Sequence, residues 1–274
     1  MKLIDLLNQA SNSISRIDAR ILLQHASNIS SEIIYLKPEL ELSEAIAKEY
    51  QQLVIRRINH EPVAKIIGKK SFWADDFIVN QHTLDPRPDS EVIIEAALKL
   101  FPNKDGKYKF IDFGTGSGCL ILSLLREFPN AIAIGSDIST EALKVARANA
   151  KALGLQDRIS FIQQNWGDSL TGEFDLIVSN PPYIPAADIE NLDEDVKLYD
   201  PLLALNGGED GLDPYRYLAK QIYKFLKKDS YAILEFGYNQ GLYIKEIFKQ
   251  NNYIIHEMLN DLAGIERAII VRRE

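Results

Sequence analysis

Several residue types that support particular functions are scarce in this chain of 274 residues. Cys119 is the only cysteine, so an internal disulfide is impossible and a cytoplasmic location is expected. The four histidines lack the spacing of metal ligands, so we expect no metal site. No apolar run approaches the ~20 residues that a membrane-spanning helix needs. The first residues also lack the apolar core of a signal peptide, and no membrane association is expected.

Basic residues are also fewer than acidic residues in this chain. Lysine and arginine number 31 against 39 aspartates and glutamates, which gives a formal net charge of −8. An acidic chain is poorly suited to hold a nucleic-acid duplex, although a local basic patch is compatible with this charge. We therefore expect no direct contact with nucleic acid. As a separate expectation, the protein is a monomer.

Glycine is absent from the whole segment before Gly68, which is unusual for strands and turns but natural for a small helical bundle. Ile46, Tyr50 and Leu53 recur at helical spacing behind Ser43, a suitable helix N-cap. Residues 1–65 are therefore predicted to form a helical domain. Nothing in this domain has catalytic character, so its default role is packing, and its expected functional role is to recognise a partner.

The sequence character changes over residues 66–85. The run from Ile66 to Trp73 and the run from Phe77 to Val79 read as two short strands around a polar turn, so this segment is predicted to be a β-hairpin linker. Residues 86–274 are predicted to form the catalytic domain. Asp89 or Ser90 is expected to cap a helix that begins near Glu91.

Strands and helices then alternate regularly. This alternation predicts an α/β fold with a doubly wound, mostly parallel sheet and helices on both of its faces. The predicted strands are Phe110–Phe113, Ala131–Ser136, Ile159–Gln163, Asp175–Ser179, Tyr231–Phe236, Tyr253–Met258 and Arg267–Val271. The predicted helices include Cys119–Phe128, Thr140–Leu153 and Tyr215–Leu226.

A glycine-rich loop joins the first of these strands to its helix. Gly114 and Gly116 allow a tight turn and close approach to a ligand, and Gly118 allows close packing of the helix. Asp137 ends the next strand, 19 residues after Gly118, where an acid accepts the hydroxyls of a ribose. Asp112 would repel a pyrophosphate but suits an ammonium group. The ligand is therefore predicted to be a nucleoside that carries a cationic amino acid, S-adenosyl-L-methionine, with S-adenosyl-L-homocysteine as product.

Two further residues follow the third strand. Asn165 is placed to hydrogen-bond an adenine edge, and Trp166 to pack on its ring, although a buried core tryptophan is an alternative for Trp166. The predicted cofactor-binding residues are Asp112, Gly114, Thr115, Gly116, Ser117, Gly118, Asp137, Asn165, Trp166 and Asn180.

The fourth strand ends in Asn180-Pro181-Pro182-Tyr183. The two prolines stiffen the chain as it leaves the sheet edge, where open α/β sheets bind their ligands. The Asn180 side-chain oxygen and the Pro181 carbonyl form a pair of acceptors that matches a planar amino group, and Tyr183 offers a face for stacking. A rigid turn at a strand end is the structural alternative. Asn180, Pro181 and Tyr183 are predicted to be catalytic.

Arg87 lies between Pro86 and Pro88, which present it more rigidly than most surface arginines. A structural salt bridge and contact with substrate are both compatible with this position. The predicted substrate-binding residues are Asn180, Pro181, Pro182, Tyr183 and Arg87.

These motifs resemble those of the class I S-adenosylmethionine-dependent methyltransferases that modify amino or amide nitrogens. The resemblance is closest to the glutamine methyltransferases of peptide chain release factors and extends over nearly the whole chain. Besides the segments described above, it includes Phe72-Trp73, Pro86–Glu91, Ile184-Pro185 and Gly207–Asp213. It implies a seven-stranded Rossmann-like sheet, a small N-terminal helical domain that holds the protein substrate, and methylation of the glutamine in a Gly-Gly-Gln motif.

The chain departs from the family pattern at two positions. Asn165 stands where the family usually has an acid, and Asp85 where an apolar residue is common. Three other functions stay open. They are methylation of a ribosomal-protein glutamine, methylation of a nucleic-acid adenine amino group, and binding by a non-enzymatic methyltransferase-like module. The Gly207–Asp213 run favours release factors over ribosomal proteins, and the acidic charge disfavours nucleic acid.

Overall fold

The computed structural model describes residues 1–168, 170–261 and 263–273. The chain divides into two compact units. The first consists of Met1–Lys69 together with Asp193–Tyr199, and the second contains Lys70–Leu192 and the chain from Asp200 onward. A segment from the middle of the sequence therefore belongs to the N-terminal unit, which the sequence pattern does not indicate.

The N-terminal unit is helical and has a hydrophobic core of its own, built around Leu3, Leu22, Leu23 and Tyr50. Its second and fourth helices begin at serine N-caps: Ser15 Oγ accepts from Asp18 N at 3.0 Å, and Ser43 Oγ accepts from Ile46 N at 3.3 Å. Its helices are α1 (Leu3–Ala10), α2 (Arg16–Ser27), α3 (Ser31–Leu36), α4 (Glu44–Ile58), α5 (Val63–Ile67) and α9 (Glu194–Tyr199).

The predicted hairpin is present as β1 (Lys69–Phe72) and β2 (Asp75–Ile78), but its first strand starts later than the sequence pattern suggested. The expectation that Ile66 and Ile67 belong to a strand is wrong, because both lie in α5. Gly68 ends that helix in the left-handed region with φ 73°. Two adjacent apolar residues fit a buried strand or a buried helical turn equally well, and here Ile66 packs into the helical core.

Within the residues described, seven strands of the second unit form one sheet in the order β5-β4-β3-β6-β7-β9-β8. The pairs among β5, β4, β3, β6 and β7 are parallel, and β9 runs antiparallel to both of its neighbours. The strands are β3 (Lys109–Phe113), β4 (Ile132–Asp137), β5 (Ile159–Gln163), β6 (Phe174–Ser179), β7 (Leu226–Glu235), β8 (Tyr253–Asn260) and β9 (Glu266–Arg273).

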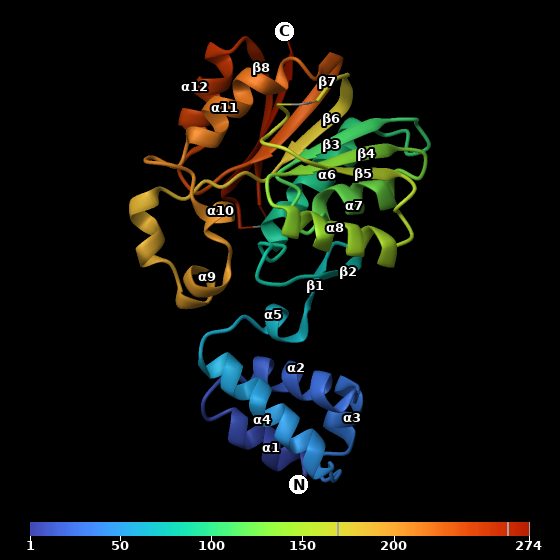
Figure 1. The fold of residues 1–274 in the computed structure, drawn as a ribbon, viewed down its shortest axis with the longest axis vertical. Helices are drawn as coiled ribbons and strands as arrows, with labels where there is room; N and C mark the ends of the chain where they lie inside the picture. The colour runs from blue at the N-terminus through green and yellow to red at the C-terminus, as the bar shows by residue number, and fades with distance from the viewer. Residues whose placement is uncertain (169, 262, 274) are drawn as a thin grey trace. The chain divides into compact units, whose positions relative to one another are not determined.

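Successive residues of the central strands enter two different cores, which explains their continuous apolar runs. Phe110 and Val178 pack with α6 (Glu91–Leu100) and α7 (Cys119–Glu127), and α8 (Thr140–Ala152) adds Ala150 to the same core. Ile111 and Ile177 pack with α11 (Asp213–Ile222) and α12 (Gly241–Gln250) on the opposite face. Figure 1 shows these two helical layers with the sheet between them. The predicted doubly wound fold is confirmed.

One helix boundary was predicted incorrectly. The helix expected over Tyr215–Leu226 ends at Ile222, and β7 already begins at Leu226. Leu226 is buried in the sheet opposite Phe174, so tertiary pairing overrides its helical spacing. Shorter helical segments are the 3-10 helices Pro88–Ser90 and Ala186–Asn191 and the helix α10 (Leu202–Leu205). In the part of the chain that the structure describes, no helix combines the length and the apolar character needed to cross a membrane.

The strand order changes direction between β3 and β6. The strands β4 and β5 lie on one side of β3, whereas β6 and β7 lie on its other side. Ligands of open α/β sheets bind outside the carboxyl ends of the strands at such a position. The residues that follow β3, β4, β5 and β6 are those singled out in the sequence, so the fold brings them to one edge.

Candidate active site

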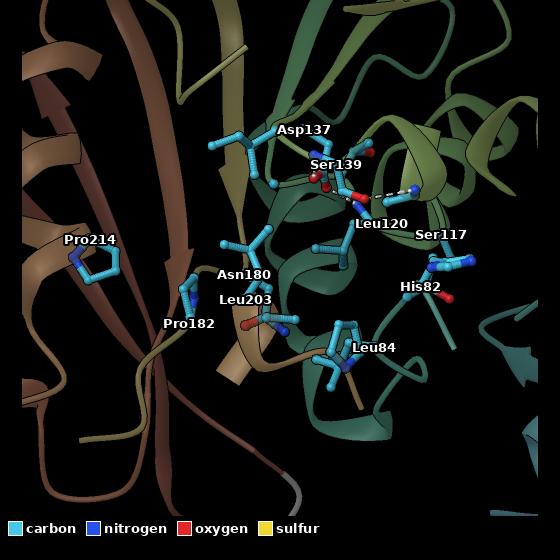
Figure 2. Close-up of a pocket in the computed structure, with 18 of the residues that line it drawn as sticks. His82, Leu84, Ser117, Leu120, Asp137, Ser139, Asn180, Pro182, Leu203 and Pro214 are labelled. Atoms are coloured by element: carbon cyan, nitrogen blue, oxygen red, sulfur yellow. Dashed lines mark hydrogen bonds between the residues drawn. The ribbon is translucent and has the colours of Figure 1, made fainter. Parts of the chain in front are cut away.

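A cavity of about 480 Å³ opens at this edge of the sheet. Gly114, Asp137, Trp166 and Asn180, which follow or end four different strands, line it together. Figure 2 shows Asp137, Asn180 and Pro182 gathered around this space. The fold therefore unites the predicted cofactor loop with the first residue of the Asn-Pro-Pro-Tyr segment.

The glycine loop is held by the neighbouring strand. The backbone N–H groups of Gly114 and Thr115 both donate to the Ser136 carbonyl at 2.9 Å, which turns the chain away from β3. Gly116 has φ 55°, and a Cβ added there would meet no atom within 4 Å, so its backbone faces open space. Gly118, with φ 81°, precedes α7, and an added Cβ would lie 3.1 Å from Leu122. Glycine is required at both positions for conformation, and at Gly118 also for helix packing.

Asp112 is almost completely buried, with 1% of its surface exposed. The Thr115 hydroxyl donates to its Oδ2 at 2.7 Å, whereas its Oδ1 has no hydrogen-bond partner among the described residues. Burial raises the pKa of the Asp112 carboxyl to about 7, against the lowering effect of the Thr115 hydrogen bond. A buried carboxylate oxygen without a donor is suited to an incoming cationic N–H group.

Asp137 ends β4 and is fixed by backbone donors. Gly116 N donates to its Oδ2 at 2.9 Å, and Ser139 N donates to its Oδ1 at 2.8 Å. Burial raises the pKa of Asp137, while these backbone hydrogen bonds lower it. Each carboxylate oxygen has a second lone pair, so both remain available to a pair of hydroxyl groups.

Asn165 and Trp166 follow β5 and both line the cavity. Trp166 has φ 53°, in the left-handed region that a bulky residue rarely adopts. This conformation brings its ring to the glycine loop, where a Cβ added at Gly114 would lie 3.3 Å from the indole. Trp166 is half-buried and Asn165 is exposed, so the ring forms a wall and the amide lies at the rim.

The Asn-Pro-Pro-Tyr segment begins where β6 ends at Ser179, whose hydroxyl donates to the Phe113 carbonyl at 2.7 Å. Asn180 and Pro182 line the cavity, and the Asn180 Nδ2 donates to the Ser90 hydroxyl at 3.2 Å. Pro181 is buried and is not among the side chains that line this cavity.

Tyr183 does not share the cavity of Asn180. It lines a second, more open cavity together with Gly237 and Gln240, and its backbone carbonyl accepts from Gln240 Nε2 at 2.9 Å. Burial raises the pKa of the Tyr183 phenol to about 12. The stacking role predicted for Tyr183 therefore has no support from its position and stays a prediction.

The glycine-rich run Gly207–Asp213 is hydrogen-bonded to the chain that directly follows the Asn-Pro-Pro-Tyr segment. Gly207 N donates to the Ile184 carbonyl at 2.9 Å, and Ala186 N donates to the Gly208 carbonyl at 2.8 Å. A Cβ added at Gly207 would lie 2.9 Å from the Tyr183 Cα. Glycine is needed here because two backbones pass in close contact.

Arg87 also lines the cavity, and its guanidinium donates to Asp200 Oδ2 at 3.1 Å. The Asp200 side chain is buried, with 2% exposed, whereas 43% of the Arg87 side chain is exposed. The structural salt bridge considered from the sequence is therefore present. The exposed part of Arg87 leaves contact with substrate open as a prediction.

Two residues near Asn180 were not singled out in the sequence. Ser90, predicted only as a helix cap, binds the Asn180 amide, and Glu235 lies buried at the end of β7. An acid directly after the apolar run of residues 232–234 is the one sequence signal that could have identified Glu235. No group of three or more His, Cys, Asp or Glu side chains suited to a metal ion occurs in the residues described.

Comparisons with known proteins agree with this geometry. Residues 104–266 match the family described as a methyltransferase domain, and residues 2–68 match the PrmC N-terminal domain. The chain is 41% identical over 258 residues to a release factor glutamine methyltransferase of Rhodospirillum rubrum, a match that covers 94% of this chain and 79% of that protein. It is 38% identical over 283 residues to a bifunctional methyltransferase of Rickettsia prowazekii, covering 97% of this chain but 55% of the relative. The chain thus spans about half the length of that bifunctional protein.

A solved structure, a methyltransferase from Pyrococcus furiosus, shares the fold with a TM-score of 0.54 and 19% sequence identity, over 81% of this chain and 96% of that one. The two family matches cover the N-terminal helices and most of the sheet unit. A non-enzymatic binding module is no longer the appropriate description, since the fold, the motifs and the relatives agree. The chain is a methyltransferase and belongs to the release factor glutamine methyltransferase family.

Proposed function

We propose that this chain uses S-adenosyl-L-methionine to methylate the side-chain amide nitrogen of the glutamine in the Gly-Gly-Gln motif of peptide chain release factors. The single observation that supports this most is the placement of Asn180. Its Nδ2 is bound to Ser90, so its oxygen is the atom left for the cavity, which Asp137 and the glycine loop also line. An acceptor at this position suits the N–H group of an amide.

The residues present fit the cofactor. Asp112 has a buried oxygen without a donor for the ammonium of the methionine part, and Asp137 has lone pairs for the ribose hydroxyls. Gly116 leaves space for close approach, and Trp166 and Asn165 are available to the adenine. When bound, S-adenosyl-L-methionine supplies an electrophilic methyl group and becomes S-adenosyl-L-homocysteine.

An amide nitrogen is a poor nucleophile because its lone pair is delocalised into the carbonyl. In the proposed reaction, the Asn180 Oδ1 and the Pro181 carbonyl accept hydrogen bonds from the two N–H groups of the substrate amide. One of these protons becomes acidic as the methyl group transfers and is released to solvent. These acceptors orient the nitrogen and favour electron density on its attacking side, so positioning and fixed dipoles supply most of the acceleration. Burial raises the pKa of the nearby Cys119 thiol to about 12, so this thiol stays protonated near neutrality and does not act as the base.

The N-terminal domain, residues 1–65, is proposed to recognise the folded release factor. It has its own core and exposes apolar side chains at its surface, including Ile17, Tyr35 and Leu36. Such side chains are suited to a protein interface. The proposal involves a single copy of the chain, acting in the cytoplasm, and no direct contact with nucleic acid.

The test is mass spectrometry of a purified release factor after incubation with this protein and S-adenosyl-L-methionine. We expect one added methyl group, which fragmentation should locate on the glutamine of the Gly-Gly-Gln motif. A release factor with alanine in place of that glutamine is the matched control and should stay unmodified. Methylation of a ribosomal protein or of adenine in nucleic acid, with no change to the release factor, would replace this proposal by one of the alternatives.

A further inference from the structure

The direction in which the Asn180 amide faces is controlled from inside the protein. This side chain has one acceptor oxygen and one NH₂ group, and only one of them can face the cavity. Nδ2 donates to the Ser90 hydroxyl at 3.2 Å. Ser90 is 3% exposed and ends the 3-10 helix that precedes α6, so this partner is held by a fixed element.

Glu235 is the second neighbour of Asn180. Ser179 on β6 pairs with Leu234 on β7, and the next residues along these parallel strands are Asn180 and Glu235. Glu235 is 1% exposed, and hydrogen bonding by the Ser90 hydroxyl and the Asn180 amide lowers the pKa of its carboxyl, whereas its Oε2 has no partner among the described residues. The three side chains therefore form one buried hydrogen-bonded group beside the cavity.

An ionised carboxylate fixes the direction of the hydrogen bonds among these three side chains. An ionised Glu235 has no proton to donate, so the Ser90 hydroxyl proton must point toward it. The Ser90 lone pairs are then free to accept from Asn180 Nδ2. Because the Asn180 amide is planar, binding its nitrogen turns its oxygen toward the opposite side.

We propose that Ser90 and Glu235 are positioning residues that hold the Asn180 amide with its oxygen toward the substrate. The inference rests on the proposed function, in which that oxygen accepts an N–H of the substrate glutamine. Ser90 lines the same cavity, but neither residue is assigned a contact with the reacting atoms. Ser90 acts by binding Asn180 Nδ2, and Glu235 acts by fixing the Ser90 proton and by accepting from the same amide.

Protonation of Glu235 would reverse the direction of these hydrogen bonds. A neutral carboxyl donates to Ser90, which can then donate to Asn180 Oδ1 and leave Nδ2 facing the substrate. Burial raises the pKa of Glu235 to about 7, the Ser90 hydrogen bond and Arg267 lower it, and Asp89 raises it. The other ionisable groups that interact with this carboxyl are Tyr183, Tyr215 and Cys119, each with a raised pKa, so none of these three changes charge near neutrality.

The experiment compares the full-length wild type with Ser90→Ala and Glu235→Gln. Ser123→Ala is the matched control, because Ser123 is also fully buried and its hydroxyl has no hydrogen-bond partner within the described residues. The turnover number kcat is measured on a release factor at saturating S-adenosyl-L-methionine from about pH 6 to about pH 8.5. Cofactor affinity is measured by calorimetry.

We expect kcat of Ser90→Ala to fall about tenfold or more, with cofactor affinity within about threefold of wild type. Wild-type kcat should decrease on the acid side of neutrality, and this decrease should be absent in Glu235→Gln. Ser123→Ala should match wild type in kcat, in the pH dependence of kcat and in cofactor affinity. Unchanged kcat in Ser90→Ala, or an acid decrease that persists in Glu235→Gln, would overturn the positioning role.

A second measurement does not depend on activity. The side-chain amide protons of Asn180, identified by their loss in Asn180→Asp, are followed by NMR in each variant. A bond to Ser90 predicts slow exchange in wild type and faster exchange with a shifted resonance in Ser90→Ala. An identical resonance and exchange rate in both proteins would refute the inference. If the wild type methylates no release factor, the proposed function fails, and this resonance alone decides the positioning role.

Discussion

The Thr115 hydroxyl donates to Oδ2 of Asp112 at 2.7 Å, and no described residue donates to the other oxygen of that carboxyl group. This asymmetry leaves one buried acceptor ready for a ligand. Burial raises the pKa of Asp112 to about 7 in the ligand-free protein, so near neutrality part of the population is protonated. A cationic ligand favours the ionised form and lowers that pKa.

We therefore expect binding of S-adenosyl-L-methionine to release protons at about pH 6.5. Calorimetry in two buffers with different ionisation enthalpies should give different observed binding enthalpies, and the difference reports the protons released. In Asp112→Asn this difference should vanish, and affinity should fall by roughly 1.5–3 kcal/mol, the contribution of a charge-assisted hydrogen bond. Equal enthalpies in both buffers for the wild type would contradict the placement of the ammonium at Asp112.

The same carboxyl makes the ligand-free protein less stable as pH rises. In the folded state its pKa is raised from 3.8 to about 7, so between these values the folded state binds more protons than the unfolded state. Stability must then decrease with rising pH across this window. A shift of this size corresponds to roughly 4 kcal/mol at most.

Asp112→Asn should accordingly stabilise the ligand-free protein, by more at about pH 8 than at about pH 5. Urea unfolding at the two pH values, with the wild type in parallel, measures this difference. The same gain at both pH values would show that Asp112 does not titrate within this range.

Asp137→Ala should weaken cofactor binding by roughly 1.5–3 kcal/mol, because two ribose hydroxyls would lose a charged acceptor. The variant also removes the acceptor of Gly116 N, so the glycine loop should become less ordered. Titration calorimetry measures the affinity, and thermal unfolding controls for the fold. Wild-type affinity in a correctly folded variant would mean that the ribose lies elsewhere.

Asn180→Ala should lose most of its turnover while cofactor affinity stays within about tenfold, that is ~1.4 kcal/mol, of wild type. The reason is that Asn180 is assigned to the substrate amide, whereas Asp112 and Asp137 are assigned to the cofactor. Mass-spectrometric rates with a release factor, combined with calorimetry, separate the two effects. Near-normal turnover would remove Asn180 from the mechanism.

Removal of the N-terminal domain tests substrate recognition. A shortened chain that begins at Gly68 keeps β1 and the whole sheet unit. It should still bind S-adenosyl-L-methionine but should methylate an intact release factor far more slowly, since a stable protein complex buries roughly 1,200 Å² or more. A short Gly-Gly-Gln peptide should be a poor substrate for both chains. Equal rates on the intact protein would assign the N-terminal helices to packing only.

Strand positions and the glycine loop could be predicted because each depends on local sequence. The apolar runs that end at Phe113 and Ser179 are buried on both faces, and such runs are visible without knowing their neighbours. The relationship between Asn180 and Glu235 could not be predicted, because it depends on the pairing of β6 with β7 across more than fifty residues of sequence. Knowledge of the strand order would have identified it.

Other errors have a similar physical origin. Ile66 and Ile67 were read as a strand because a pair of apolar residues carries no period. The position of Tyr183 was also not visible in the sequence: it lies beside Gly237 rather than in the cavity of Asn180, and its stacking role stays a prediction. The assignment of Asp193–Tyr199 to the N-terminal unit depends on contacts that no local pattern encodes.

That last segment has a consequence for synthesis. Tyr199 donates to the Asn59 carbonyl at 2.8 Å, and His60 Nε2 lies 2.7 Å from a Glu194 carboxylate oxygen, so α9 is bound to the end of α4 within the N-terminal unit. A ribosome makes residues 1–69 first, and they can form their core while the rest of the chain is still being made. The unit is complete only after residue 199 has emerged, by which time β3, β4, β5 and β6 have also been made. The N-terminal unit is thus begun before the sheet unit, but it is finished only after much of the sheet has been made.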